Sequence, residues 1–166
     1  MVEKDLVFKG KIKHLGPFDW KEFYRFCYMW LVDKEYWLVE KEYTEKITPT
    51  GKEVEVHWEA KRKISDYFRF FLKVDWRILG MKKVEVEFEG KKIELDKGQV
   101  ECNVTAILEK DYEARWETNP FMKFLRSIYD RYIIRARVED YENRVYEEGD
   151  EFLAQAKAFL ALEGKH

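Results

Sequence analysis

The chain has 166 residues, of which 39% are charged and 17% aromatic. Its 33 acidic and 31 basic side chains leave a net charge of only −2, which argues against nucleic-acid binding because such proteins normally carry a basic excess. The length is typical of one domain that buries roughly 70% of its unfolded surface. The longest apolar run, FCYMWLV, is far shorter than the ~20 residues that span a bilayer, so we expect no membrane span.

Composition also predicts the compartment. Cys27 and Cys102 are too few and too far apart for a disulfide framework or a zinc site, which favours a reducing environment. The opening residues, MVEKDLVFKGKIKH, are charged throughout, so no signal peptide is expected. The abundance of Lys and Glu with few amide side chains is typical of thermophilic or archaeal proteins. We therefore expect a soluble, cytoplasmic domain.

The first elements are a strand and a helix. Residues 4–15 alternate between apolar and polar side chains, which predicts a half-buried strand that Gly16-Pro17 ends. Asp19 is followed three residues later by Glu22, the pattern of a capping box at a helix start. The helix should continue to about residue 34.

Further strands follow in a meander. A Thr-Pro-Thr-Gly turn at 48–51 predicts a hairpin, and Gly80-Met81 predicts a break between two strands. Alternation of apolar and polar residues favours an antiparallel sheet of six to seven strands with one face exposed to water. Besides the first strand, the predicted strands cover residues 36–48, 53–61, 68–78, 84–88, 93–95 and 100–108.

The C-terminal region changes to a helical period. Pro120 is suited to a first helical position, and apolar residues recur at helical spacing after it. Gly149 is the point at which a break or bend is expected. The sequence thus predicts a single α+β domain over residues 1–166, with a sheet portion at 1–111 and a C-terminal helical region at 112–166.

This order of elements resembles the helix-grip fold of START-like proteins, in which a curved antiparallel sheet and a helix grip a long C-terminal helix. The resemblance covers most of the chain and rests on element order and length, so it implies no ligand residues. Two stretches, KISDYFRFFLKVDWRILGM and FLRSIYDRYIIRARVEDYE, also look similar to uncharacterised archaeal proteins of unknown function.

Aromatic side chains supply the candidate ligand site. A sheet and a C-terminal helix lined with rings could enclose a hydrophobic small molecule, and the same rings could instead fill the interior at native packing density. The candidate cavity residues are Trp58, Phe70 and Trp76 from strands, facing Phe124, Ile128 and Tyr132.

The first helix carries a second candidate surface. Its aromatic residues cover an arc of about 200°, about twice the stripe that a surface helix needs, so it must meet neighbours on two sides. One neighbour is the sheet, and the other is the C-terminal helices, a ligand or a second subunit. An interaction protein that forms homo-oligomers through helices is therefore the alternative function, with a partner surface at Phe26, Tyr28, Trp30, Phe152 and Phe159.

Catalytic and metal-binding residues are not predicted. His57 lies among acidic residues, but neighbours on one strand face are ~7 Å apart, and no second His or Cys joins it. In the alternating pattern of the first strand, His14 falls on the same side as the apolar residues that should form the core. Both cysteines occupy positions where a small core side chain is expected. No cofactor, metal, acid, base or nucleophile is indicated, so an enzyme using the same cavity is the third hypothesis.

Overall fold

The computed structural model describes residues 3–65, 67–110, 120–128 and 135–163. These residues form five strands and three helices. In chain order they are β1 (Glu3–Phe18), α1 (Trp20–Asp33), β2 (Trp37–Thr48), β3 (Gly51–Lys63), β4 (Phe68–Phe88), β5 (Lys91–Lys110), α2 (Pro120–Ile128) and α3 (Arg135–Glu163). The predicted α+β class is confirmed.

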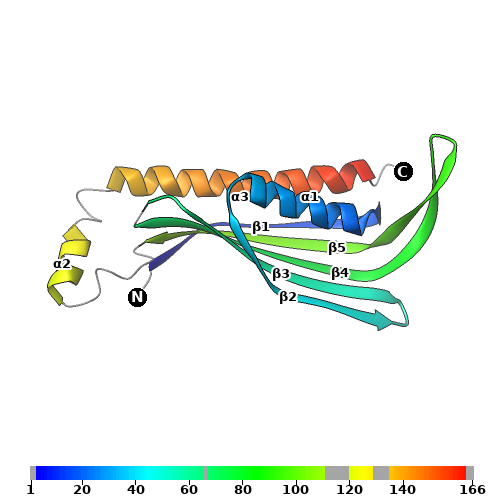
Figure 1. Ribbon diagram of the computed structural model, residues 1–166, viewed down its shortest axis with the longest axis horizontal. Helices are drawn as coiled ribbons and strands as arrows, with labels where there is room; N and C mark the ends of the chain where they lie inside the picture. Colours follow the sequence, from blue (N-terminus) through cyan, green and yellow to red (C-terminus); the bar gives the residue numbers. More distant parts are fainter. Residues whose placement is uncertain (1–2, 66, 111–119, 129–134, 164–166) are drawn as a thin grey trace.

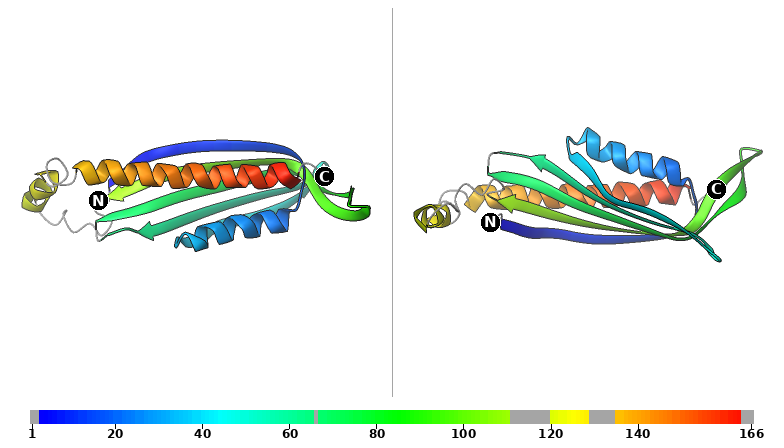
Figure 2. Two further views of the ribbon diagram at one scale, coloured as in Figure 1. Left: turned by 90° about the horizontal axis from the view of Figure 1, so that it is seen from above. Right: turned by 60° about the horizontal axis from the view of Figure 1, so that its bottom comes forward.

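The strands form one antiparallel sheet in the order β1-β5-β4-β3-β2. Helices α1 and α3 lie side by side on one face of this sheet, with α3 packed on β1 and β5 (Figures 1 and 2). Helix α2 lies beyond the end of the sheet, so none of the described helices covers the opposite face (Figure 1). We call the two sides of the sheet the helix-covered face and the open face.

The sheet has five described strands where the sequence predicted six or seven. The predicted strands at 68–78 and 84–88 are one strand, β4, because Gly80 produces a register shift between Leu79 and Lys82 without ending the pairing. Its partner β5 is likewise continuous, and Gly98 allows close approach, since a Cβ there would lie 3.0 Å from the Leu79 carbonyl oxygen. A bulge of this kind bends a strand and leaves it in the sheet.

Helix α1 begins where the capping pattern predicted. Asp19 is the N-cap residue, and its side chain accepts a hydrogen bond from the Glu22 backbone N–H at 3.2 Å. The preceding strand, however, does not end at Gly16-Pro17, because β1 remains paired with β5 as far as Phe18. β1 is an edge strand, where a proline can point its missing N–H away from the ladder.

Helix α3 continues through Gly149 without a break. A Cβ at this position would lie 3.0 Å from both the Ala106 Cβ and the Phe8 Cδ1, so the glycine allows the helix to approach the sheet closely. This close approach, rather than a helix end, is the physical reason for a glycine here.

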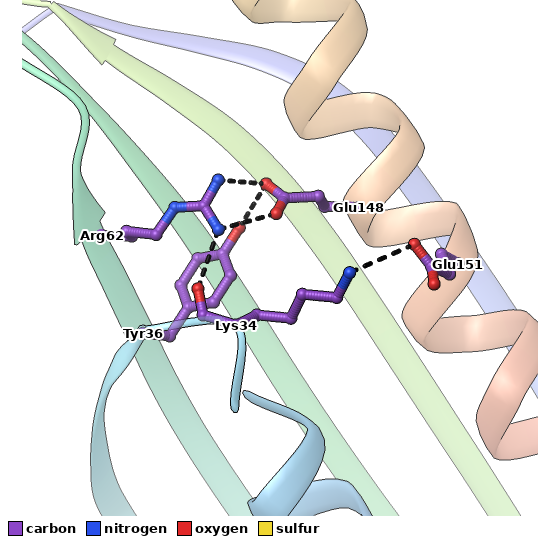
Figure 3. A network of polar contacts seen from close by, with 5 residues as sticks. All are labelled: Lys34, Tyr36, Arg62, Glu148 and Glu151. Carbon is purple, nitrogen blue, oxygen red and sulfur yellow. Dashed lines mark hydrogen bonds and ion pairs between the residues drawn. The ribbon is translucent and has the colours of Figure 1, made fainter. Parts of the chain in front are cut away.

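A polar network ties α3 to the sheet (Figure 3). The Arg62 guanidinium of β3 forms a two-pronged ion pair with Glu148 of α3, at 2.8 and 2.9 Å, and also donates to the Lys34 carbonyl at 2.8 Å. Tyr36 donates its hydroxyl to Glu148 at 3.0 Å. Burial, followed by the charge of Glu148, raises the pKa of Tyr36, so it remains a donor at neutral pH. The network joins three segments far apart in sequence.

Candidate functional site

The structure describes five of the six residues predicted to enclose a cavity, and it separates those of the strands from those of α2. Trp58, Phe70 and Trp76 are buried on the helix-covered face, where the rings of Trp58 and Trp76 meet edge to face with centroids 4.2 Å apart. Phe124 is 61% exposed on α2, and Ile128 ends that helix, which lies beyond the sheet (Figure 2). Tyr132 lies outside the described residues. Phe124 and Ile128 therefore do not face the three strand residues, which pack within the core.

The residues proposed as a partner surface mostly contact one another. Phe26 of α1 stacks on Phe159 of α3 with ring centroids 5.0 Å apart, and Trp30 meets Phe152 edge to face at 5.3 Å. Phe152 is only 1% exposed. Tyr28 is 39% exposed and contacts Trp58. The second flank of α1 is thus covered by α3 of the same chain.

A solvent-open cleft lies where α1 passes over β2. It has a volume of about 440 Å³ and is lined by Trp20, Lys21 and Tyr24 of α1 and by Glu40 and Tyr43 of β2. Trp20 and Tyr24 are one turn apart on α1 and therefore share one face of the helix. Their ring centroids are 5.7 Å apart. The Tyr43 ring meets the Tyr24 ring edge to face, with centroids 6.1 Å apart, so the cleft has aromatic walls.

Hydrogen bonds hold the polar groups of the cleft in fixed positions. Glu40 accepts two bonds on Oε1, from the Tyr24 hydroxyl at 2.6 Å and from the Trp58 indole N–H at 3.1 Å. The Trp20 indole N–H donates to the Tyr43 hydroxyl at 3.3 Å. Oε2 of Glu40 has no such donor among the described residues and is available to a ligand.

The environment keeps both cleft tyrosines protonated. Desolvation, followed by the hydrogen bond to Glu40, raises the pKa of Tyr24. Desolvation is also the largest cause that raises the pKa of Tyr43, whose hydroxyl donates to Glu45 at 2.8 Å. The same bond lowers the pKa of Glu45. At neutral pH both cleft tyrosines are therefore phenols that donate hydrogen bonds to glutamate side chains.

A β-bulge determines which side of the sheet the β2 carboxylates occupy. The register between β2 and β3 shifts between Glu40 and Glu42, with Glu40 opposite Trp58 and Glu42 opposite His57. Trp58 and His57 are consecutive, so they point to opposite faces of the sheet. In a regular strand Glu40 and Glu42 would share one face. The bulge instead places Glu40 in the cleft and Glu42 on the open face, a use of bulges common near functional sites.

Cys27, Cys102 and His14 lie in or beside the core, as their places in the apolar pattern predicted. Cys27 and Cys102 are both buried, and burial raises the pKa of each thiol, so neither has the thiolate character of a nucleophile. His14 is partly buried, with its ring edge to face against Phe18. None of the described helices combines the length and the apolar character needed to cross a bilayer.

Comparison of the chain with protein-family models, curated protein sequences and solved structures finds no significant match. The function must therefore be argued from the geometry of the chain itself.

Proposed function

We propose that this protein is a non-catalytic binding module that holds a small, largely apolar molecule in the cleft between α1 and β2. The observation that supports it is an aromatic-walled cleft of about 440 Å³ with one ordered carboxylate, Glu40. Small-molecule sites typically measure ~300–1,000 Å³ and combine apolar walls with a few fixed polar groups. The site is beside α1, and not under α3 as the helix-grip resemblance implied.

The polar end of the ligand follows from Glu40. Its Oε1 already accepts two hydrogen bonds, which leaves Oε2 for a ligand. Because a carboxylate oxygen can only accept, a ligand that reaches Oε2 must donate a hydrogen bond or carry a positive charge. Flat aromatic walls attract organic cations through their ring faces. The favoured ligand class is therefore a small aromatic amine, and an anionic ligand of the same shape should be disfavoured.

Helix α3 is packed onto the sheet, so the proposed ligand site is the cleft beside α1. The homo-oligomer alternative loses its main argument, because Phe26, Trp30, Phe152 and Phe159 pair within the chain. For the enzyme alternative, both cysteines are buried and their thiol pKa values are raised, so neither supports a nucleophilic role. Ligand binding at the cleft is the function that the geometry supports best.

Three probes of one shape test the proposal: benzylamine, benzyl alcohol and benzoate. Each is titrated into ¹⁵N-labelled protein while the Trp20 indole N–H signal is followed, because that group lies in the cleft wall and donates to Tyr43. We expect benzylamine to bind most tightly and benzoate least. Glu40→Gln should remove the preference for the amine, whereas Glu59→Gln, on the open face, should leave it unchanged. Absence of any shift at Trp20 with all three probes would refute the proposed site.

A further inference from the structure

Four titratable side chains meet on the open face of the sheet, on the side opposite the cleft. Glu42 of β2, His57 of β3 and Asp75 of β4 are directly opposite one another in the sheet register. Glu55 precedes His57 by two residues on β3 and so shares its face. One ligand atom each from Glu42, Glu55 and His57 lies within 4.8 Å of the other two. Reasoning along one strand missed this group, because its members come from neighbouring strands.

Asp75 fixes the orientation of the His57 ring. His57 Nδ1 lies 2.5 Å from the Asp75 Oδ1, and a carboxylate can only accept, so Nδ1 carries the proton. In the neutral imidazole the lone pair is then on Nε2, which lies 3.4 Å from the Oε2 of Glu42. A histidine that ligates a metal in proteins usually donates its other N–H to a carboxylate in this way, which fixes the tautomer and makes the ligating nitrogen more basic.

The spacing of the ligand atoms suits a small divalent cation. Bonds of ~2.1 Å at tetrahedral angles place two zinc ligands ~3.4 Å apart, which is the separation of His57 Nε2 and Glu42 Oε2. Glu55 is 44% exposed and can rotate the remaining distance. A hollow of about 290 Å³ adjoins the group, with His57, Asp75 and Asn103 in its lining. It offers room for a water molecule or a further ligand on the cation.

We propose that Glu42, Glu55 and His57 form a binding site for a divalent cation of the zinc type, with Asp75 as a positioning residue. Imidazole together with carboxylate suits Zn²⁺ better than Mg²⁺ or Ca²⁺, which prefer oxygen ligands alone. The bulge in β2 is part of the site, because it turns Glu42 toward His57. The proposal is independent of the aromatic cleft, which lies on the other side of the sheet.

The surrounding charges both favour and oppose a cation. Three carboxylates face His57 from β2, β3 and β4, and the hydrogen bond that His57 donates to Asp75 is the main cause that raises the pKa of His57. Glu101 of β5 also borders the hollow, but it already pairs with lysines of β1. Arg77 is the competing cation, with its Nε 3.6 Å from the Glu55 carboxylate. The Arg77 side chain is 56% exposed, so this pair is weak and the guanidinium can move into solvent.

Zinc titration of the chelator-treated full chain, followed by calorimetry, tests the proposal. We expect one Zn²⁺ to bind per chain and the binding to weaken as His57 becomes protonated at acid pH. Glu42→Gln and His57→Gln should remove the binding, and Asp75→Asn should weaken it ~10–100-fold. Arg77→Gln should strengthen it, because the competing cation is removed. Glu59→Gln, a change of the same kind on the same strand face, should have no effect.

Nuclear magnetic resonance of the His57 ring separates a metal site from a structural ion pair. Zinc should shift the Nε2 signal of the wild-type protein while Nδ1 keeps its proton, and the Asp75→Asn variant should lose that pattern. The proposal is overturned if no zinc binds, if His57→Gln binds as well as the wild type, or if Glu59→Gln weakens binding as much as Glu42→Gln. It is also overturned if Arg77→Gln weakens binding, since the arginine would then support the site.

Discussion

Replacing Arg62 by methionine tests how α3 is held on the sheet. The guanidinium pairs with Glu148 of α3 through two contacts of 2.8 and 2.9 Å and donates to the backbone carbonyl of Lys34 at 2.8 Å. Its face also lies over the Tyr36 ring at 5.0 Å. Methionine keeps the length of the aliphatic stem but leaves Glu148 without its cation. Tyr36 then remains as the one partner of this carboxylate in the network (Figure 3).

The expected magnitude follows from burial. Removing one partner of a buried ion pair costs ~3–5 kcal/mol, because the other charge is left uncompensated. The two side chains retain 16% and 15% exposure, so water relieves part of that cost. We therefore expect the lower end, ~3 kcal/mol, as the loss of unfolding free energy. For a chain of this length that corresponds to a fall of ~6–12 °C in Tm.

The assay is urea unfolding followed by tryptophan fluorescence. Arg135→Met is the matched control, since Arg135 pairs with Glu139 at 3.9 Å on α3 with 81% and 69% exposure. Exposed pairs of this kind contribute ~0.3–0.5 kcal/mol. The double variant Arg62→Met/Glu148→Leu should cost less than the sum of the single variants, because neither charge is then left alone. A loss at Arg62→Met no larger than at the control would refute the structural role of the pair.

Three further changes test the packing and the open face. Gly149→Ala should destabilise the protein by ~1–3 kcal/mol in thermal unfolding, because the added methyl group overpacks the contact between α3 and the sheet. Alanine otherwise favours a helix, so a higher Tm of the variant would contradict the close packing. Phe152→Ala should lower the free energy of unfolding in urea by ~3–5 kcal/mol. The control Phe121→Ala, at an exposed position, should change it little. Equal losses of stability in the two variants would show that α3 does not form part of the core. The His57 pKa is raised in the fold, so its stabilising contribution is complete below the unfolded pKa of ~6.5 and disappears as pH rises through the folded value. Asp75→Asn should lower that pKa in an NMR titration, and an unchanged pKa would contradict the contact.

Local signals in the sequence identified the start of α1 and the alternating faces of the strands. The Asp19 cap depends only on residues within one turn, so it could be read without knowledge of the fold. The same is true of the hairpin turn before Gly51, where Thr48 pairs with the glycine. Strand number could not be obtained in this way, because Gly80 reads equally as a break or as a bulge until the opposite strand is known.

The candidate sites depended on contacts between elements. The sequence showed that α1 has apolar residues on two flanks, but it could not show that Phe159 and Phe152 of α3 cover the second one. It also showed the carboxylates of β2 without revealing that a bulge sends Glu40 and Glu42 to opposite faces. A single extra residue in one strand reverses side-chain direction, and only its pairing with the neighbouring strand reveals that.

A charged α+β chain with an aromatic core could be predicted from the residues alone, because composition, hydrophobic periodicity and capping act over short distances. Contacts between distant elements select which rings form the core and which line a cleft, and they bring His57 into register with Glu42 and Asp75. Those groups are as many as 33 residues apart in the chain. Their proximity depends on strand order and register, which many distant contacts determine together.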